Sequence, residues 1–533
     1  MHRKIWTVFS LVTILLVGIA TRLWYIARVQ PAQVASSQNR WTVSVASTRG
    51  TIYDTNLLPL VNESHEYRAA MIPSERFLAH VSGATTAKDF AALRDQLAQG
   101  VPSSVRLTKP IGFTNGMQLF WVPARYSERL LAPHTIGYLD ASETCGVTGI
   151  ESAFNEVLEQ YKGAATASFS VDGRGSLLFG VSPECLDTTA NSVGGVVLTL
   201  DKKLQMITED VGAKGLIKGA VVVMQPYSGE ILALASFPSF QPQTVAQSID
   251  EDNGALLNRA LSLYDCGSVF KIITTAAALE LGISAQKSFV CEGYLEIEGT
   301  RFHCHNRLGH GSLDMQEAFA QSCNLYYIQL AQMIGADNLL EMAEKFGLNK
   351  EVILADSLEA SAALLPDLST LKASRAALAN LSFGQGYLMA SPLHFAQIVN
   401  TIVNNGTLPN TSLVRGFLDA EKNFTNVNKG SGAEVISAKT ATVLQEMMAM
   451  TVLDGTGRSA KPNSCSAAGK TGTAETGQII DGNPVVQSWF VGYFPVESPQ
   501  FVVCVLAEDS TGTNARATEI FRSLADEIMY EMK

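Results

Sequence analysis

The sequence predicts a mixed α/β (α+β) fold in which helices pack on an antiparallel sheet, preceded by a β-rich N-terminal domain and one membrane-spanning helix. After Gly194-Gly195, strand-like runs come first, helical runs occupy the middle, and strand-like runs return near the end. That order is typical of helices packed on an antiparallel sheet. Residues 30–192 alternate short apolar runs with polar turns, which indicates a separate β-rich domain.

The N-terminus carries an apolar stretch long enough to cross a bilayer. Residues 5–26 follow Arg3-Lys4 and are almost entirely apolar, and about 20 such residues suffice for one span. The basic flank predicts a cytoplasmic tail at residues 1–4, with everything after the span outside the cytoplasm. Gly18-Ile-Ala20 also fits a signal-peptide cleavage site, so a removed secretory signal is the alternative.

The second domain is expected over residues 193–533, and its elements follow in a clear order. A strand at 196–200 opens it, and a hairpin over 219–224 and 230–235 turns through Pro226-Tyr-Ser-Gly229. Helices are predicted at 269–281 and 315–334, and the last strands at 488–493 and 501–506.

Composition excludes several classes of protein. The chain has 533 residues, 47% of them hydrophobic, and a formal net charge of -11. Such a chain is long and apolar enough to build sizeable cores, so it is not a disordered scaffold. The acidic balance, without a long basic run, predicts no nucleic-acid partner.

Ser268-Val-Phe-Lys271 is the first of three strings that together supply the groups for acyl transfer to an active serine. Ser-x-x-Lys also occurs at 284–287 and 369–372, but only Ser268 opens an apolar helical run. At a helix N-terminus its hydroxyl lies near backbone N–H groups that stabilise an oxyanion. Lys271, one turn on, becomes a general base if burial removes its proton.

The second and third strings complete the set. Ser322-Cys-Asn324 falls between two amphipathic stretches, so it is expected at a helix junction that projects polar side chains into a cleft. Lys470-Thr-Gly-Thr473 precedes the last strands and is expected on the edge of the sheet. There Gly472 allows close approach of a substrate backbone, while Lys470, Thr471 and Thr473 offer a cation and hydroxyls to a carboxylate.

The order of these strings resembles that of class B penicillin-binding proteins, and the resemblance covers almost the whole chain. It includes Arg49-Gly-Thr-Ile-Tyr-Asp54, His134-Thr-Ile-Gly-Tyr138 with Gly149-Ile-Glu151, Leu198-Thr-Leu-Asp201, Asn258-Arg-Ala260, Gly384-Gln-Gly386 and Asp454-Gly-Thr-Gly457. Thr55, Leu57 and Cys266 depart from the family pattern without removing a catalytic group. The resemblance implies a serine β-lactamase-like transpeptidase domain at 193–533 and a pedestal, or dimerisation-like, domain at 30–192.

The resemblance also implies a reaction and its partners. The substrate would be a peptidoglycan stem peptide ending in D-alanyl-D-alanine, and β-lactam antibiotics would acylate Ser268. Lys271 would be the base, Ser322 and Lys470 would pass a proton to the leaving D-alanine, and Asn324 would orient the substrate amide. No metal or organic cofactor is needed for this chemistry. A membrane glycosyltransferase or the division or elongation machinery would be the partner.

Other functions remain open on the sequence. A D,D-carboxypeptidase or β-lactamase uses the same residues with water as acceptor, and a non-catalytic wall-synthesis scaffold would keep the fold. The sequence does not separate division, elongation and sporulation roles. It also leaves open the acceptor amine, lysine or diaminopimelate, and the oligomeric state.

Eight cysteines leave a further question open. Cys291 and Cys304 are suitably placed for a disulfide in an extracytoplasmic protein. The same two cysteines with His303, His305 and His310 form a possible zinc site. Free thiols and ordinary surface histidines are the third interpretation.

Overall fold

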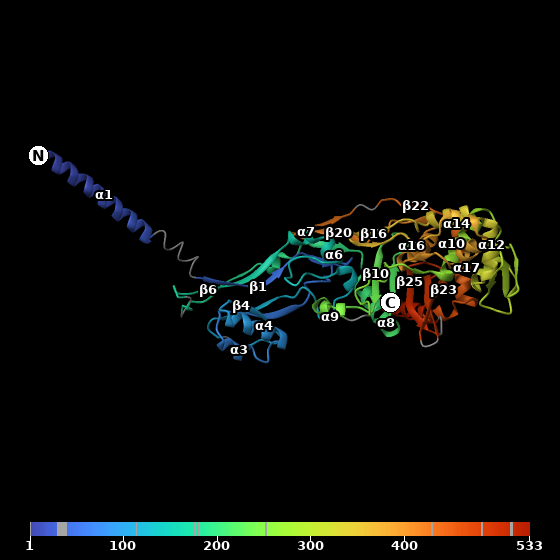
Figure 1. Ribbon diagram of the computed structural model, residues 1–533, viewed down its shortest axis with the longest axis horizontal. Coiled ribbons are helices and arrows are strands. Elements are labelled where there is room, and N and C mark those ends of the chain that lie inside the picture. The colour runs from blue at the N-terminus through green and yellow to red at the C-terminus, as the bar shows by residue number, and fades with distance from the viewer. Residues whose placement is uncertain are drawn as a thin grey trace. The chain divides into compact units, whose positions relative to one another are not determined.

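The computed structural model describes residues 2–28, 40–112, 114–174, 176–178, 181–250, 253–427, 430–480, 483–511 and 515–532. The start predicted for the β-rich domain, residue 30, lies outside the described residues. The chain forms two compact units (Figure 1), which are made of Met1–Arg49, Asn62–Arg125 and Tyr161–Ser192, and of Gly50–Val61, Tyr126–Gln160 and Val193–Lys533.

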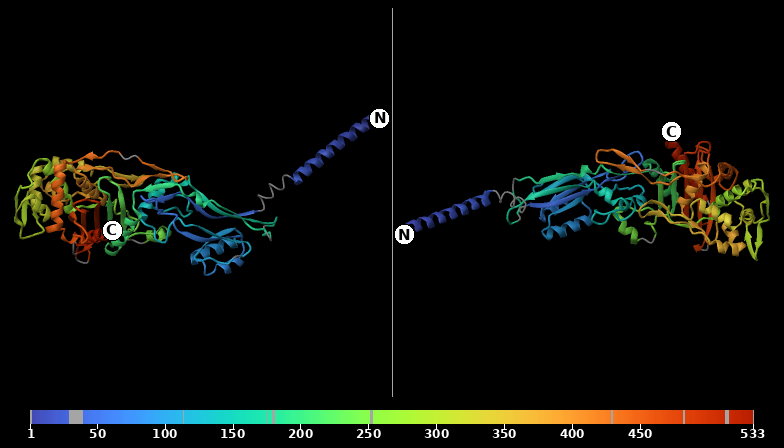
Figure 2. Two further views of the ribbon diagram at one scale, coloured as in Figure 1. Left: turned by 180° about the vertical axis from the view of Figure 1, so that it is seen from behind. Right: turned by 90° about the horizontal axis from the view of Figure 1, so that it is seen from above.

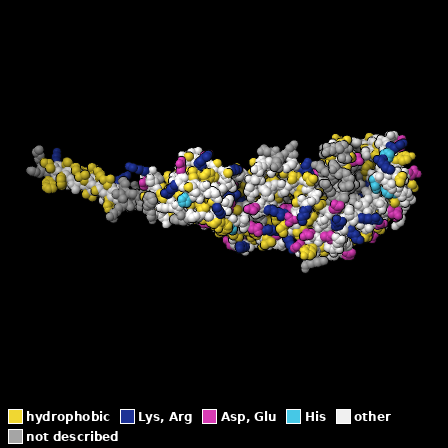
Figure 3. Space-filling model, turned by 90° about the horizontal axis from the view of Figure 1, so that it is seen from below, with side chains coloured by type: hydrophobic (Ala, Val, Ile, Leu, Met, Phe, Trp, Pro, Cys, Tyr) yellow, Lys and Arg dark blue, Asp and Glu magenta, His cyan; other side chains and the backbone are white. Residues whose placement is uncertain are grey.

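Helix α1 (His2–Arg28) contains the predicted membrane segment. Its stretch Lys4–Tyr25 is long and apolar enough to cross a bilayer, and no other helix among the described residues meets that test. The apolar side chains along it are exposed, including Ile14 and Leu15, and they form the yellow rod at one end of Figure 3. A helix that is apolar all round and unburied by protein is a candidate membrane span, and a signal sequence near an N-terminus has the same features.

Apart from α1, the described residues of the smaller unit form two three-stranded sheets and the helices α3 and α4. One sheet has the order β1-β6-β7 and the other β4-β3-β5. Along β6 (Gly163–Ser170) buried and half-buried residues alternate, as expected for a strand with one face in the core. The remaining elements are β1 (Arg40–Thr48), β3 (His65–Met71), α3 (Arg76–Val81), α4 (Ala87–Ala98), β4 (Ser103–Leu107), β5 (Met117–Pro123), β7 (Glu184–Asp187) and η1 (Thr189–Asn191).

A five-stranded sheet organises the larger unit, with the order β10-β9-β25-β24-β23 and antiparallel pairing throughout. The predicted hairpin is β9 (Gly219–Met224) with β10 (Ile231–Phe237), and the predicted final strands are β24 (Asn483–Phe494) and β25 (Phe501–Thr511). β23 (Ala468–Ile480) carries the Lys470 string and forms an edge of the sheet, as predicted. The mixed α+β class is therefore confirmed.

Helices cover both faces of this sheet. In β25, Val502, Cys504 and Leu506 belong to one core, while Val503 and Val505 belong to the other. The first core contains α10 (Lys271–Glu280), α12 (Asn324–Ile334), α16 (Pro392–Val403) and α17 (Ala438–Asp454), and the second contains α8 (Lys202–Gly215) and α18 (Ala515–Glu531). Figure 2 shows these layers from two further sides. Because successive side chains of a strand point to opposite faces, β25 contributes residues to two separate hydrophobic cores.

Two segments expected in the N-terminal domain belong to the larger unit. β2 (Thr51–Tyr53) pairs in parallel with β8 (Gly195–Leu198), in a four-stranded sheet of order β2-β8-β20-β21. Within Tyr126–Gln160, the short helices α5 (Pro133–Ile136) and α6 (Gly149–Ala153) pack near β10 and β16–β17. The last segment of the larger unit begins at Val193, and the range 30–192 predicted as one domain is divided between both units.

The rest of the larger unit consists of short elements that connect the layers. They are α7 (Asn155–Glu159), η2 (Pro242–Thr244), α9 (Val245–Asp250), β11 (Tyr264–Asp265), η3 (Gly267–Phe270), β12 (Phe289–Cys291), β13 (Tyr294–Ile297), β14 (Thr300–His303), β15 (Gly311–Leu313), α11 (Met315–Ala320), α13 (Ala336–Lys345), β16 (Val352–Ala355), β17 (Leu358–Ala360), α14 (Leu368–Ala373), α15 (Arg375–Ser382), β18 (Met389–Ala390), β19 (Thr407–Leu408), β20 (Val414–Leu418), β21 (Phe424–Asn426), β22 (Ala433–Glu434) and η4 (Arg458–Ala460).

Replacement of Trp489 by alanine tests the packing of the sheet on its helices. The indole is 1% exposed, its ring centroid lies 5.6 Å from that of Phe395, and its Nε1–H donates to the Asp265 carbonyl at 2.9 Å. We expect Trp489→Ala to lower the free energy of unfolding by about 3–5 kcal/mol, as for other large buried aromatics. Urea unfolding followed by circular dichroism measures this. Ile217→Ala, at a 75% exposed position, serves as the control and should change little.

Candidate active site

Ser268 lies in η3, the single 3₁₀ turn that leads directly into α10. The predicted helix start is therefore confirmed. Ser268 is half-buried and lines a cavity of about 760 Å³. Its hydroxyl has no hydrogen-bond partner among the described residues, so it is available to react with a molecule that enters the cavity.

Gly267 brings this turn against the edge strand of the sheet. Its φ is +59°, a left-handed conformation that glycine adopts without steric cost. A Cβ at this position would lie 2.3 Å from the Thr473 carbonyl oxygen, so no larger residue fits. The Gly267 N–H donates to the Gly384 carbonyl at 2.9 Å. Because Gly267 approaches Thr473 so closely, the first and third strings lie side by side.

Lys271 connects the first string to the second. Its side chain is fully buried, and its Nζ donates to the Ser322 carbonyl at 2.7 Å, to the Ser322 hydroxyl at 3.1 Å and to Asn324 Oδ1 at 2.7 Å. The Tyr327 ring lies 5.3 Å from Nζ. All the oxygens that accept from the amine are neutral, so no carboxylate among these partners stabilises its charge.

The second string occupies a break between two helices, as predicted. α11 ends at Ala320 and α12 begins at Asn324. Ser322 has a φ of +52°, which is uncommon for a residue with a side chain. This conformation points the Ser322 and Asn324 side chains at the cavity, which both residues line. Cys323, between them, is fully buried and does not line the cavity.

The third string forms the cavity wall on β23. Thr471 and Thr473 line the cavity, while Gly472 and Lys470 are buried behind them. Lys470 Nζ donates to the Thr471 carbonyl at 3.0 Å, and its ammonium lies 5.6 Å from the Phe319 ring. The Thr471 hydroxyl is hydrogen-bonded to that of Thr456 at 2.7 Å. The cavity therefore has hydroxyl groups on its surface and two lysines beneath it.

Burial sets the protonation of both lysines. It lowers the pKa of Lys271 to about 7, because the charged amine loses its hydration. Burial also lowers the pKa of Lys470 well below its usual range, and the positive charge of Lys271 lowers it further. Near neutral pH a substantial fraction of Lys271 is therefore neutral and able to accept a proton.

The cavity wall also contains residues that lie outside the three strings. His303, His305, Arg307 and Glu475 line it, as do Asn380, Phe383, Gln385, Ser459 and Thr518. His303 and His305 were candidates for a metal site, but they face the cavity. Arg307 is the residue most relevant to ligand charge, because its guanidinium adds a cation to the rim. Arg307 lies in a turn between β14 and β15, outside all three strings, and gave no sequence signal.

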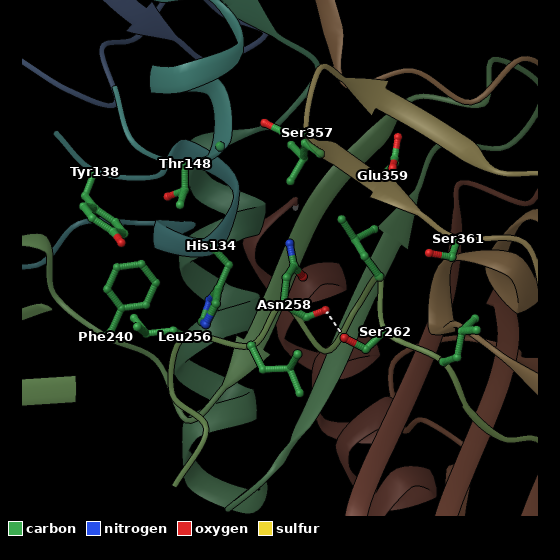
Figure 4. Close-up of a pocket in the computed structure, with 15 residues that line it drawn as sticks. His134, Tyr138, Thr148, Phe240, Leu256, Asn258, Ser262, Ser357, Glu359 and Ser361 are labelled. Atoms are coloured by element: carbon green, nitrogen blue, oxygen red, sulfur yellow. Dashed lines mark hydrogen bonds between the residues drawn. The ribbon is translucent and has the colours of Figure 1, made fainter. Parts of the chain in front are cut away.

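A second cavity, of about 370 Å³, lies in the same unit and shares no lining residue with the first (Figure 4). His134, Tyr138 and Phe240 line one side of it. His134 Nε2 is hydrogen-bonded to the Ala255 carbonyl at 2.7 Å, and burial lowers its pKa to about 4, so it stays neutral at physiological pH. The lining therefore reflects packing of the His134 motif in the larger unit, and it contains no nucleophile with an adjacent base.

The structure also brings together part of the predicted cysteine and histidine cluster. The side-chain ligand atoms of Cys291, Cys304, His310 and Cys323 lie within 4.8 Å of one another. All eight cysteines are free thiols. Cys323 was missing from the predicted set, and His303 and His305 are not part of the observed one.

Comparison with known proteins places this site in a family. The model of the penicillin binding protein transpeptidase domain matches residues 219–526, more than half of the chain. The chain belongs to the penicillin-binding protein transpeptidase family. This confirms the predicted class B penicillin-binding protein and the predicted enzyme class, a serine acyl transferase of the transpeptidase type.

Individual relatives of this penicillin-binding protein are moderately similar. Stage V sporulation protein D of Bacillus subtilis is 30% identical over 396 residues, which cover 71% of this chain and 59% of that protein. Peptidoglycan D,D-transpeptidase PbpA of Mycobacterium tuberculosis is 32% identical over 342 residues, or 59% and 67% of the two chains. The crystal structure of a D,D-transpeptidase domain from Eggerthella lenta matches with a TM-score of 0.66 at 26% identity, and covers 91% of this chain and 99% of that one.

The lowered pKa of Lys271 predicts how acylation of the penicillin-binding protein depends on pH. Neutral Lys271 is the form that accepts a proton, and its fraction rises as the pH passes upward through about 7. The rate of labelling by a fluorescent penicillin should therefore increase between about pH 5 and about pH 8 and then level off. The rate is measured by stopping the labelling reaction at fixed times, at pH values at which the protein remains folded. A rate that is flat or falls across that range would contradict a base with this pKa.

Proposed function

We propose that this chain is a serine D,D-transpeptidase that crosslinks peptidoglycan stem peptides. The observation that carries the proposal is the meeting of all three strings at one cavity, with Lys271 hydrogen-bonded to both Ser322 and Asn324. The relative PbpA, whose name describes a peptidoglycan D,D-transpeptidase, supports the choice of substrate.

Acylation begins at Ser268. Neutral Lys271 removes the hydroxyl proton, and the oxygen attacks the penultimate carbonyl of a stem ending in D-alanyl-D-alanine. The backbone N–H groups of Ser268 and Thr473 stabilise the oxyanion, since the Gly267 contact holds η3 against β23. Terminal D-alanine leaves with a proton delivered through Ser322 and Lys470. The product is an ester of Ser268.

The remaining residues bind and orient the donor stem. The cation of Lys470 and the hydroxyls of Thr471 and Thr473 hold the terminal carboxylate, and Gly472 lets the substrate backbone approach β23. Asn324 orients the amide of the stem. An amine of a neighbouring stem then attacks the ester, forms the new amide bond and releases the Ser268 hydroxyl.

The same site explains reaction with β-lactam antibiotics, whose strained amide takes the place of the terminal peptide bond. In the cell, α1 anchors the enzyme in the membrane with the catalytic unit outside the cytoplasm, since Arg3 and Lys4 favour a cytoplasmic N-terminus. A membrane glycosyltransferase that supplies uncrosslinked glycan strands is the partner that this reaction requires.

Replacement of the nucleophile tests the proposal with controls inside the same chain. We expect Ser268→Ala to lower fluorescent-penicillin labelling by at least roughly a thousandfold, because loss of a serine nucleophile removes the covalent step. Ser284→Ala and Ser369→Ala alter the two other Ser-x-x-Lys sequences, both at exposed serines, and should label normally. Digestion and mass spectrometry should find the drug on Ser268. Drug on another peptide would refute the mechanism.

The lifetime of the penicillin adduct separates a transpeptidase from a hydrolase. The proposed enzyme uses an amine as acceptor, so we expect its penicillin ester to persist for many minutes without an amine. A β-lactamase would release the drug and turn over, and a D,D-carboxypeptidase would release D-alanine from a stem peptide without forming a crosslinked dimer. Mass spectrometry of the intact protein over time and of the peptide products distinguishes the three. Full growth with Ser268→Ala as the sole copy would favour a scaffold.

A further inference from the structure

Three cysteines and one histidine converge beside the active site from four separate segments. Cys291 ends β12, Cys304 follows β14, His310 precedes β15, and Cys323 lies in the break between α11 and α12. The three cysteines are buried and His310 is half-buried. None of the four lines the active-site cavity. The proposed acyl transfer uses none of them.

The distances within this cluster match those around a tetrahedral metal ion. Cys291 Sγ and Cys304 Sγ each lie 3.5 Å from His310 Nδ1, and Cys304 Sγ lies 3.9 Å from Cys323 Sγ. Zinc bonds of about 2.3 Å to sulfur and about 2.0 Å to nitrogen would place two sulfurs about 3.8 Å apart, and a sulfur and a nitrogen about 3.5 Å apart. The four ligand atoms therefore already have the spacing that such an ion requires.

A disulfide explains the arrangement less well. Two bonded sulfurs lie about 2.05 Å apart, so Cys304 and Cys323 would have to move together by almost 2 Å. A single bridge would also leave a third thiol and the imidazole without a role. Three soft thiolates and one imidazole are instead a typical ligand set for structural zinc, and they disfavour magnesium or calcium, which prefer oxygen ligands.

The surrounding backbone supports the same conclusion. Among the described strands, β12 pairs only with β15, and β13 only with β14, in ladders of three and four residue pairs. Within residues 289–313 few apolar side chains are buried, namely Ile297, Phe302 and Leu313. Hairpins this short are marginal by themselves, and a structural metal is one way in which small elements gain stability.

We propose that Cys291, Cys304, His310 and Cys323 bind one zinc ion in a closed, four-coordinate structural site. The three cysteines bind as thiolates, and their protons are released to solvent. Since Cys323 stands between Ser322 and Asn324, the ion fastens the helix break of the second string to the hairpins of residues 289–313. The metal takes no part in the acyl transfer itself.

Metal analysis of the full chain tests this site. The protein is purified in detergent under reducing conditions, with an affinity tag that contains no histidines, and its zinc is measured by inductively coupled plasma mass spectrometry. We expect about one zinc per chain, as in other four-coordinate structural sites. Cys291→Ser and His310→Ala should each lose most of the metal and unfold at a lower temperature.

Two matched controls keep the result specific. Cys145→Ser removes an exposed thiol outside the cluster, and His305→Ala removes the neighbouring imidazole, whose Nδ1 lies 3.9 Å from Cys304 Sγ but which is not one of the four ligands. Both variants should retain zinc. Equal zinc content in Cys291→Ser, His310→Ala and the unchanged protein would overturn the proposal.

Cobalt provides a second measurement that does not depend on folding of the variants. Replacement of zinc by Co²⁺ in the unchanged protein should give the visible absorption bands of tetrahedral cobalt together with thiolate-to-metal charge-transfer bands. The absence of these bands, with no zinc after incubation with zinc salt, would refute the site. A Cys304–Cys323 disulfide found by mass spectrometry in protein isolated without reductant, with no metal bound, would do the same and would identify a redox bridge.

Discussion

The active site depends on the hydrogen bonds that the buried amine of Lys271 makes with the second string. This lysine lies one turn after Ser268 and is held by three neutral oxygens, two from Ser322 and one from Asn324. A buried ammonium is stable only with well-placed partners, and neutral acceptors compensate its lost hydration only in part. The result is a pKa of about 7, suitable for a general base near neutral pH. The same three bonds fix the position of the second string.

This arrangement requires an uncommon backbone at the helix break. Ser322 must present both its carbonyl and its hydroxyl to one amine, and its φ of +52° makes that possible. Such a conformation costs of order 1–3 kcal/mol and persists only where surrounding contacts impose it. Lys271 binds the break from α10, and Cys323 is fully buried within the break. A zinc ion at Cys323 would supply the restraint that the short hairpins alone do not.

Local patterns in the sequence predicted the secondary structure around each of the three strings. A helix start, a helix junction and an edge strand each have a short-range sequence signature. These local patterns did not predict the contact of Lys271 with the Ser322 carbonyl, which depends on how α10 packs on the break. Of the five cysteines and histidines considered for a metal site, Cys291, Cys304 and His310 lie together whereas His303 and His305 are not part of that group, for a physical reason. Along β14 and its extension the buried residues are Phe302 and Cys304, whereas His303 and His305 are exposed, as the two-residue period of a strand requires.

The parallel pairing of β2 with β8 joins residues about 145 positions apart, so the division of residues 30–192 between two units had no local signal.

The two buried lysines make the proposed site responsive to its substrate. Burial lowers the pKa of Lys470, and Lys271 lowers it further because two like charges in one desolvated region repel each other. If a stem peptide binds as proposed, its terminal carboxylate would lie at Thr471 and Thr473, and that negative charge would favour the protonated form of Lys470. A protonated Lys470 in turn disfavours a charge on Lys271, and so increases the fraction of neutral base next to Ser268. The substrate would thereby promote the protonation state that its own acylation needs.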